Sequence, residues 1–290
     1  MTVLEAIQKS TEFLGKKNVE SPRLQTELLL AHLLKLPRMK LYLNFDRVLT
    51  AAETDALREL VLRRSRREPL QHIVGSTSFC GWEITVNRHA LIPRPETELL
   101  AEAGWLFLAG GRTPPATALD FGTGTGCLAI ALAAKCPDAR ITALDVSPEA
   151  LALARENAAK NQVAGRIEFL AGDGFAALGG GPRQFDLIIS NPPYIPTAEI
   201  ATLEPEVRDF DPRAALDGGA DGLDFYRRLA AQAGAFLNTG GKLMLEFGDG
   251  QAAALKKIFG DEKWIVEAVR EDYSQRARIL IARTNEFTQK

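Results

Sequence analysis

The sequence contains few of the residues that build disulfide scaffolds or metal centres. Three cysteines and three histidines occur among its 290 residues. Three thiols in so long a chain exclude a disulfide framework and favour a reducing compartment. His32, His72 and His89 all precede the segments expected to form a sheet, and no cysteine and histidine spacing matches a zinc site. We therefore expect no metal and assign none of these histidines a catalytic role.

Long apolar runs are missing as well. No stretch reaches the roughly 18 uncharged apolar residues that a transmembrane helix needs. Glu5 and Lys9 interrupt the N-terminal stretch where the apolar part of a secretory signal would lie. We therefore expect a cytoplasmic protein without a membrane partner.

Neither sign of charge is in large excess over the whole chain, whose formal charge is -2. This argues against a protein that coats nucleic acid, because such domains are usually basic. The total conceals a split, since residues 1–80 carry 13 basic against nine acidic side chains and residues 81–290 carry 22 against 28. The basic part includes four clustered arginines, which could complement a helix dipole or bind an acidic partner or RNA: Arg63, Arg64, Arg66 and Arg67.

The N-terminal part is expected to form a small all-helical domain, because residues 2–68 place apolar side chains at helical spacing. Ser21 before Pro22 predicts a helix start. The apolar stripe of that helix is expected to comprise Leu24, Leu28, Leu29, Leu30 and Leu33. Thr50 with Glu53 predicts a capping box at a later helix.

The pattern then changes twice. Around Gly81 apolar residues alternate with polar ones, which predicts a β-hairpin. Beyond it, helical and strand-like segments alternate, which predicts an α/β fold with a doubly wound parallel sheet. We locate strands at 117–121, 140–146, 166–173, 185–190 and 241–248, and helices at 96–109, 127–135, 148–161 and 223–237. The expected parts are thus a helical domain at 1–70, a hairpin linker at 71–95 and a sheet domain at 96–290.

A glycine-rich loop follows the first strand of this sheet. It places Gly122, Thr123, Gly124, Thr125 and Gly126 between that strand and a helix, so the backbone can turn tightly and approach a ligand. A dinucleotide fingerprint would need a further glycine where Cys127 stands. Asp120 before the loop also favours a cationic ligand over a pyrophosphate.

S-adenosylmethionine meets these requirements, because it carries a sulfonium and an α-ammonium group and no phosphate. Asp145 ends the next strand and is placed to accept hydrogen bonds from ribose hydroxyls. Asp173 follows the third strand and could meet the adenine edge, although an aspartate at a strand end is often a turn residue. Gly174 is expected to lie beside it in the same site.

The sequence NPPY follows the fourth strand and carries Asn191, Pro192, Pro193 and Tyr194. Methylation of an amide or an aromatic amine is difficult because the nitrogen lone pair is delocalised. A site can help by accepting hydrogen bonds from both N–H groups and by fixing the nitrogen in line with the methyl donor. Asn191 offers a side-chain carbonyl, Pro192 offers a backbone carbonyl without an N–H, and Tyr194 can lie against a planar group.

The connection after NPPY is long for a compact domain, at roughly 30 residues, which favours a functional loop. Residues 196–222 contain seven acidic side chains against two arginines. We expect an acidic rim there, which suits a basic protein substrate better than a polyanion.

Four motifs together resemble the peptide chain release factor N5-glutamine methyltransferases over nearly the full length. They are LIPRPETE at residues 91–98, DFGTGTG at 120–126, ISNPPYI at 189–195 and DPRAALDGGADGL at 211–223. The resemblance implies a mostly parallel, seven-stranded, Rossmann-like methyltransferase sheet with a hairpin linker and a helical domain that docks the substrate. It also implies methyl transfer from S-adenosyl-L-methionine to the glutamine of the GGQ tripeptide in class 1 release factors.

The resemblance also assigns roles within the site. Residues 122–126 and Asp145 are expected to hold the donor, Asn191 to touch both donor and glutamine, and the rest of NPPY to complete the glutamine pocket. The family often has an aromatic residue where this chain has Gly174. We expect a monomer that binds no nucleic acid stably.

The residues themselves leave open two alternatives to a protein glutamine methyltransferase. NPPY is shared with adenine and guanine amino-methyltransferases that act on DNA or rRNA, since an amide and an exocyclic amine are both planar NH2 groups. A donor-binding module without catalysis is a third possibility, although an intact NPPY argues against it.

Overall fold

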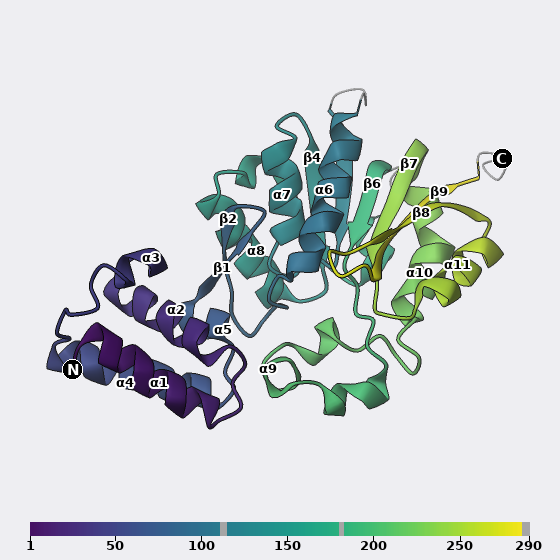
Figure 1. Cartoon of the computed structure of the whole chain (residues 1–290). Coiled ribbons are helices and arrows are strands. Elements are labelled where there is room, and N and C mark those ends of the chain that lie inside the picture. Colours follow the sequence, from purple (N-terminus) through teal and green to yellow (C-terminus); the bar gives the residue numbers. More distant parts are fainter. Residues whose placement is uncertain (111–114, 180–182, 286–290) are drawn as a thin grey trace. The chain divides into compact units, whose positions relative to one another are not determined.

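The computed structural model describes residues 1–110, 115–179 and 183–285 (Figure 1). These residues form two compact units. The first combines Met1–Ser76 with Glu204–Phe210, and the second contains the rest of the described chain. None of the helices in the described ranges combines the length and the apolar character needed to cross a membrane.

The helical unit packs its helices around a core that includes Val3, Leu14, Leu29 and Leu30. Its helices are α1 (Val3–Gly15), α2 (Pro22–Leu34), α3 (Arg38–Leu41), α4 (Ala51–Ser65), α5 (Leu70–Val74) and α9 (Pro205–Arg208). Thr50 and Glu53 form the predicted capping box at the start of α4.

The start of α2 differs in part from the expectation. Ser21 does occupy the N-cap position, but its φ of 47° is left-handed and its side chain caps no backbone N–H. Leu29 and Leu30 are buried whereas Leu24 is 40% exposed. Proline at the first position of α2 thus fixes the boundary without a side-chain cap, and the apolar stripe is narrower than predicted.

Most of the arginine cluster is used within the chain. Arg64 is buried and donates to Glu206 Oε1 at 2.7 Å, and Arg67 pairs with both Glu204 and Glu206. Arg63 pairs with Glu68 at 2.6 Å. Arg63 and Arg64 do lie in the last turn of α4, as the helix-dipole interpretation requires, and the acidic partners of Arg63, Arg64 and Arg67 belong to the chain itself.

Replacing Glu206 by glutamine is expected to lower the free energy of unfolding of the helical unit by roughly 2–4 kcal/mol, because it leaves the buried Arg64 charge without a counterion. Denaturant unfolding followed by circular dichroism measures the change. Glu204→Gln is the control, because Glu204 is 76% exposed and should contribute less than about 1 kcal/mol. Equal effects of the two variants would refute this explanation.

The predicted hairpin is present as β1 (Ser76–Phe79) and β2 (Trp82–Thr85). Its two-residue turn consists of Cys80 and Gly81, with φ values of 51° and 87°. Two successive positive φ angles are typical of the type I′ turn, whose twist matches that of the strands.

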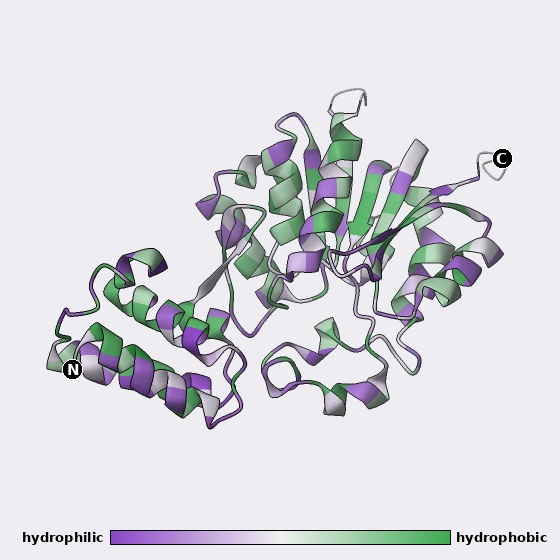
Figure 2. Cartoon of the chain, in the orientation of Figure 1, coloured by the Kyte–Doolittle hydropathy of each residue, from purple (hydrophilic) through white to green (hydrophobic). Residues whose placement is uncertain are grey.

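The second unit contains a seven-stranded sheet in the order β5-β4-β3-β6-β7-β9-β8. The strands are β3 (Thr117–Phe121), β4 (Arg140–Asp145), β5 (Ile167–Ala171), β6 (Phe185–Ser190), β7 (Leu237–Glu246), β8 (Trp264–Glu271) and β9 (Ala277–Thr284). The first five run parallel, and β9 pairs antiparallel with β7 and β8. The doubly wound, mostly parallel sheet is confirmed. Its central strands are largely hydrophobic (Figure 2).

Helices cover both faces of this sheet. One apolar cluster joins α6 and α7 to the strands, and a second joins α10 and α11 to the other face (Figure 1). The helices are α6 (Pro95–Ala109), α7 (Cys127–Lys135), α8 (Pro148–Lys160), α10 (Asp224–Gln232) and α11 (Ala252–Asp261). Short 3-10 turns lie at Ala164–Arg166, Gly174–Leu178, Thr197–Thr202, Arg213–Ala215 and Ala233–Phe236.

The strand order fixes where a ligand can bind. From β3 the chain proceeds to β4 and β5 on one side and later to β6 and β7 on the other. Open parallel sheets bind ligands at the carboxyl ends of the strands, next to this change of direction. The glycine-rich loop follows β3 and NPPY follows β6, so both flank that point.

Candidate active site

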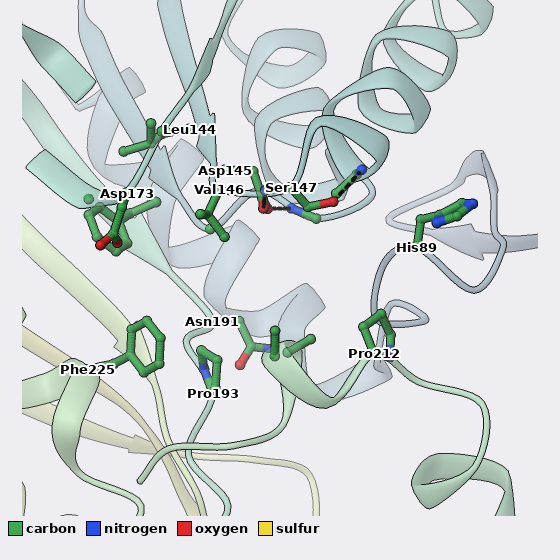
Figure 3. A pocket seen from close by; sticks show the side chains of 18 of the residues that line it. His89, Leu144, Asp145, Val146, Ser147, Asp173, Asn191, Pro193, Pro212 and Phe225 are labelled. Atoms are coloured by element: carbon green, nitrogen blue, oxygen red, sulfur yellow. Dashed lines mark hydrogen bonds between the residues drawn. The ribbon is translucent and has the colours of Figure 1, made fainter. Parts of the chain in front are cut away.

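A cavity of about 320 Å3 opens at the carboxyl ends of the parallel strands. Figure 3 shows Asp145, Val146 and Ser147 on one side and Asn191 and Pro193 on the other, with Phe225 and His89 at opposite ends. All the residues that line it belong to the unit that contains the sheet.

The glycine-rich loop forms one wall of the cavity through Gly122 and Gly124. Gly122, Gly124 and Gly126 have φ values of 77°, 54° and 82°. A Cβ on Gly126 would also lie 3.0 Å from Ala154 of α8. The loop therefore requires glycine both for its left-handed backbone and for close contact with the next helix. Thr123 and Thr125 are buried and do not line the cavity.

Asp120 lies behind this loop and does not line the cavity. Its Oδ2 accepts hydrogen bonds from Thr123 Oγ1 at 2.6 Å and from the Ala129 amide at 3.1 Å. Burial raises its pKa to about 7, against the lowering effect of these two bonds. The Asp120 carboxylate thus holds the glycine-rich loop to the start of α7. It can affect a ligand in the cavity only by fixing the conformation of that loop.

Asp120→Asn is expected to remove a pH dependence of stability. Because the pKa of Asp120 in the folded state exceeds the 3.8 of an ordinary aspartate, the native state binds the extra proton, and the free energy of unfolding falls as pH rises from about 4 to 7. The difference between parent and variant should change by up to a few kcal/mol over that window, since one pKa unit corresponds to about 1.4 kcal/mol. Unfolding at several pH values measures it, and parallel curves for the two proteins would contradict it.

Asp145 ends β4 and lines the cavity. Its Oδ2 accepts from the Gly124 amide at 2.8 Å and its Oδ1 from the Ser147 amide at 2.9 Å. A carboxylate offers about four acceptor positions, so both oxygens can still accept from a ligand. The two backbone bonds fix the carboxylate against the glycine-rich loop.

Asp173 and Gly174 lie at another part of the cavity wall. Asp173 is largely exposed and accepts from Arg228 Nη1 at 2.7 Å. A Cβ on Gly174 would overlap with Arg228 Nη2. The guanidinium of Arg228 therefore occupies the space that a side chain at position 174 would need.

Asn191 lines the cavity directly after β6. Its Nδ2 donates to Thr97 Oγ1 at 3.1 Å, and its buried Oδ1 accepts no hydrogen bond from any residue that the structure describes. Pro193 lines the cavity too, whereas Pro192 and Tyr194 do not. Burial raises the pKa of the Tyr194 hydroxyl.

Comparisons with known proteins match both parts of the chain. A family described as PrmC N-terminal domain matches residues 5–75, and one described as methyltransferase small domain matches residues 106–203. The release factor glutamine methyltransferase of Geobacter sulfurreducens is 47% identical over 89% of this chain and 88% of its own. That of Chlorobaculum tepidum is 42% identical over 96% of each chain. The chain belongs to the release factor glutamine methyltransferase family.

A solved structure supports the fold assignment. A methyltransferase from Pyrococcus furiosus superposes with a TM-score of 0.51 at 21% identity, over 76% of this chain and 97% of that chain. This likeness concerns the sheet architecture alone.

Several residues that line the cavity of this family member were not predicted. Arg88 and His89 belong to the segment after the hairpin, and Phe225 belongs to α10. The sequence gives His89 no role because it lies far in sequence from the strand ends, but the fold brings it to the cavity. Nothing in the local sequence distinguishes it from a surface histidine. The long loop contributes Pro212, Ala214 and Ala215 to the wall.

The acidic rim expected on this loop is largely neutralised. Glu204 and Glu206 pair with Arg64 and Arg67 of the helical unit. Asp211 is buried and pairs with Arg94 at 2.5 Å. The remaining ion pairs join Arg208 to Asp209, Arg213 to Asp217, and Arg227 to Asp221. Because most of these carboxylates are paired with arginines, the acidic composition of the loop is weak evidence for a basic substrate.

Across residues 1–110, 115–179 and 183–285 no group of three or more histidine, cysteine, aspartate or glutamate side chains is arranged to hold a metal ion.

Proposed function

We propose that this chain transfers a methyl group from S-adenosyl-L-methionine to the side-chain amide nitrogen of the glutamine in the GGQ tripeptide of class 1 release factors. Membership of the family supports the reaction. The structural observation that supports this reaction is the state of Asn191, a residue of the cavity wall. Its carbonyl oxygen Oδ1 is buried and has no partner among the described residues. Such an acceptor suits an amide N–H.

The residues around the cavity fit the methyl donor. Asp145 has acceptor positions left for ribose hydroxyls, and the amide-lined loop at 122–126 allows a close backbone approach. We assign Asp173 and Gly174 to the adenine end, and Asp120, Thr123 and Thr125 to support of the loop. The donor would supply an electrophilic methyl group on a sulfonium, with S-adenosyl-L-homocysteine as product, and no metal is needed.

The NPPY residues would then act on the acceptor. We propose that Asn191 Oδ1 and the carbonyl of Pro192 accept the two N–H bonds of the glutamine amide, so that its nitrogen is held in one orientation. Pro192 has no N–H that could compete, and Pro193 restricts the loop. Tyr194 would lie against the planar amide. Positioning and fixed dipoles would thereby lower the barrier without a general base in the first step.

The three parts of the chain would have different functions. We propose that residues 1–70 dock the release factor, residues 71–95 form the linker, and residues 96–290 hold the donor and perform the transfer. The enzyme would act as a monomer in the cytoplasm, where termination of translation takes place, without a stable nucleic-acid or membrane partner.

The decisive experiment combines the purified protein, labelled donor, and a release factor in wild-type form or with its GGQ glutamine replaced by alanine. We expect label in the wild-type factor and none in the mutant. Persistent labelling of the mutant, or labelling of DNA or rRNA alone that falls with salt, would overturn the assignment. Donor affinity without turnover on any acceptor would favour a binding module instead.

A further inference from the structure

Two buried polar side chains, Thr97 and Glu246, lie beside the half-buried Asn191 of NPPY. Asn191 follows β6 and Glu246 ends β7, and since Ser190 is paired with Leu245 in the parallel register, these two residues come next on neighbouring strands. Thr97 belongs to the first turn of α6, which packs on β6 and β7. Thr97 is 2% exposed and Glu246 is 3% exposed.

The hydrogen bonds among these groups have a defined direction. An ionised carboxylate only accepts, a threonine hydroxyl has one hydrogen, and an asparagine amide has two N–H donors and one carbonyl. The Thr97 and Asn191 side chains lie close enough to the Glu246 carboxylate for hydrogen bonding to lower its pKa, and its buried Oε2 has no other partner among the described residues. Thr97 Oγ1 then uses its lone pair to accept from Asn191 Nδ2 at 3.1 Å.

This arrangement determines which way the Asn191 amide faces. With its NH2 directed at Thr97, next to Glu246, the remaining polar atom of this cavity-lining side chain is Oδ1, which is buried and has no partner among the described residues. The flipped amide would place its carbonyl oxygen against a carboxylate, so that two acceptors would face each other without a proton.

We propose that Thr97 and Glu246 are positioning residues that hold the Asn191 carbonyl toward the acceptor nitrogen. This inference rests on the proposed function and adds two residues outside the NPPY motif to its machinery. Neither residue touches the substrate; both act through the orientation of Asn191.

The charge of Glu246 gives the arrangement a pH dependence. Burial raises the pKa of Glu246 to about 7, Thr97 lowers it and Glu96 raises it, while Arg278 and Asn191 lower it. Tyr194 and Tyr226 also lie near this carboxylate. Above its pKa Glu246 only accepts, which fixes the amide. Below it the acid can donate to the Asn191 carbonyl, so the orientation is no longer enforced and turnover should fall.

The test compares two substitutions at position 97. Val has the shape of Thr without the hydroxyl, so Thr97→Val should lower kcat on a release factor about tenfold or more while the Kd of the donor stays within about twofold. Thr97→Ser retains the hydroxyl and should restore most of the turnover. Thr26→Val is the matched control, because Thr26 is fully buried in the helical unit and its hydroxyl has no partner among the described residues.

A second variant tests the carboxylate. Glu246→Gln keeps the size of the side chain, but its amide can donate a hydrogen bond, so kcat should fall about tenfold. The kcat of this variant should also no longer decrease as the pH falls below about 7. A carboxyl-selective NMR titration gives a readout that needs no methyl acceptor. The Glu246 signal should titrate near pH 7 in the parent chain and at higher pH in Thr97→Val, which lacks one hydrogen-bond donor.

The outcomes separate the two proposals. If the parent chain fails to methylate the release factor but Glu246 titrates as stated, the proposed function is wrong and the hydrogen-bond arrangement stands. If Thr97→Val keeps both the parent kcat and the parent titration, the positioning role is wrong whatever the substrate. An equal loss of kcat and donor affinity in Thr97→Val would show a general structural role and would also overturn it.

Discussion

Alanine in place of Asn191 is expected to lower kcat about 100- to 1,000-fold while the donor Kd stays within about twofold. The side chain supplies the buried carbonyl oxygen that has no partner among the described residues. Its removal takes away an acceptor that acts on the glutamine amide as the nitrogen becomes nucleophilic. The contacts assigned to the donor come from the loop after β3 and from Asp145, so binding of the donor should persist.

Steady-state methylation at saturating donor, together with calorimetric donor binding, measures the two effects separately. Asn238→Ala provides the control, because Asn238 lies at the other end of β7, where it donates to Asp186. The proposed role of Asn191 fails if the alanine variant loses donor affinity alone and turns over normally at saturating donor.

Asp145→Ala is expected to raise the donor Kd about 100-fold, with a smaller change in kcat at saturating donor. A hydrogen bond to a charged group contributes roughly 1.5–3 kcal/mol, and 1.4 kcal/mol corresponds to a factor of ten. Two ribose hydroxyl bonds to this carboxylate would account for the loss. The variant also removes the acceptor for the Gly124 amide, so the glycine-rich loop should become less ordered.

Asp173→Ala serves as the comparison. Asp173 lines the same cavity, but its carboxylate is 74% exposed and pairs with Arg228, so its loss should raise the donor Kd only a few-fold. Similar effects of the two alanine variants would contradict the distinct role given to Asp145, and calorimetry with donor or product distinguishes the cases.

The sequence predicts those parts of the site that local motifs encode. The loop at 122–126, Asp145 and Asn191 each directly follow or end a strand, and parallel strands bring their carboxyl ends together. The antiparallel strands β8 and β9 were not located, because residues 264–271 mix charged and apolar side chains without a clean alternation.

Tertiary contacts account for what could not be predicted. Asn191 and Thr97 are 94 residues apart in sequence, and Arg64 and Glu206 are 142 apart. No local pattern marks such pairs, so the sequence places Thr97 only within the LIPRPETE motif, and for the arginines it leaves open a helix-dipole role or binding of an acidic partner or RNA. The cavity position of His89 depends in the same way on how the segment after the hairpin folds back.

Residues Glu204–Phe210 belong to the helical unit although they lie far in sequence from its first 76 residues, and this limits which gene segments can be exchanged by recombination. The chain passes between the two units three times, at residues 76–77, 203–204 and 210–211. Recombination that exchanged the first 76 residues alone would import Arg64 without the glutamate that neutralises it. The helical unit and this short insertion are therefore expected to be exchanged or to diverge together, as one module encoded in two separate stretches of the gene.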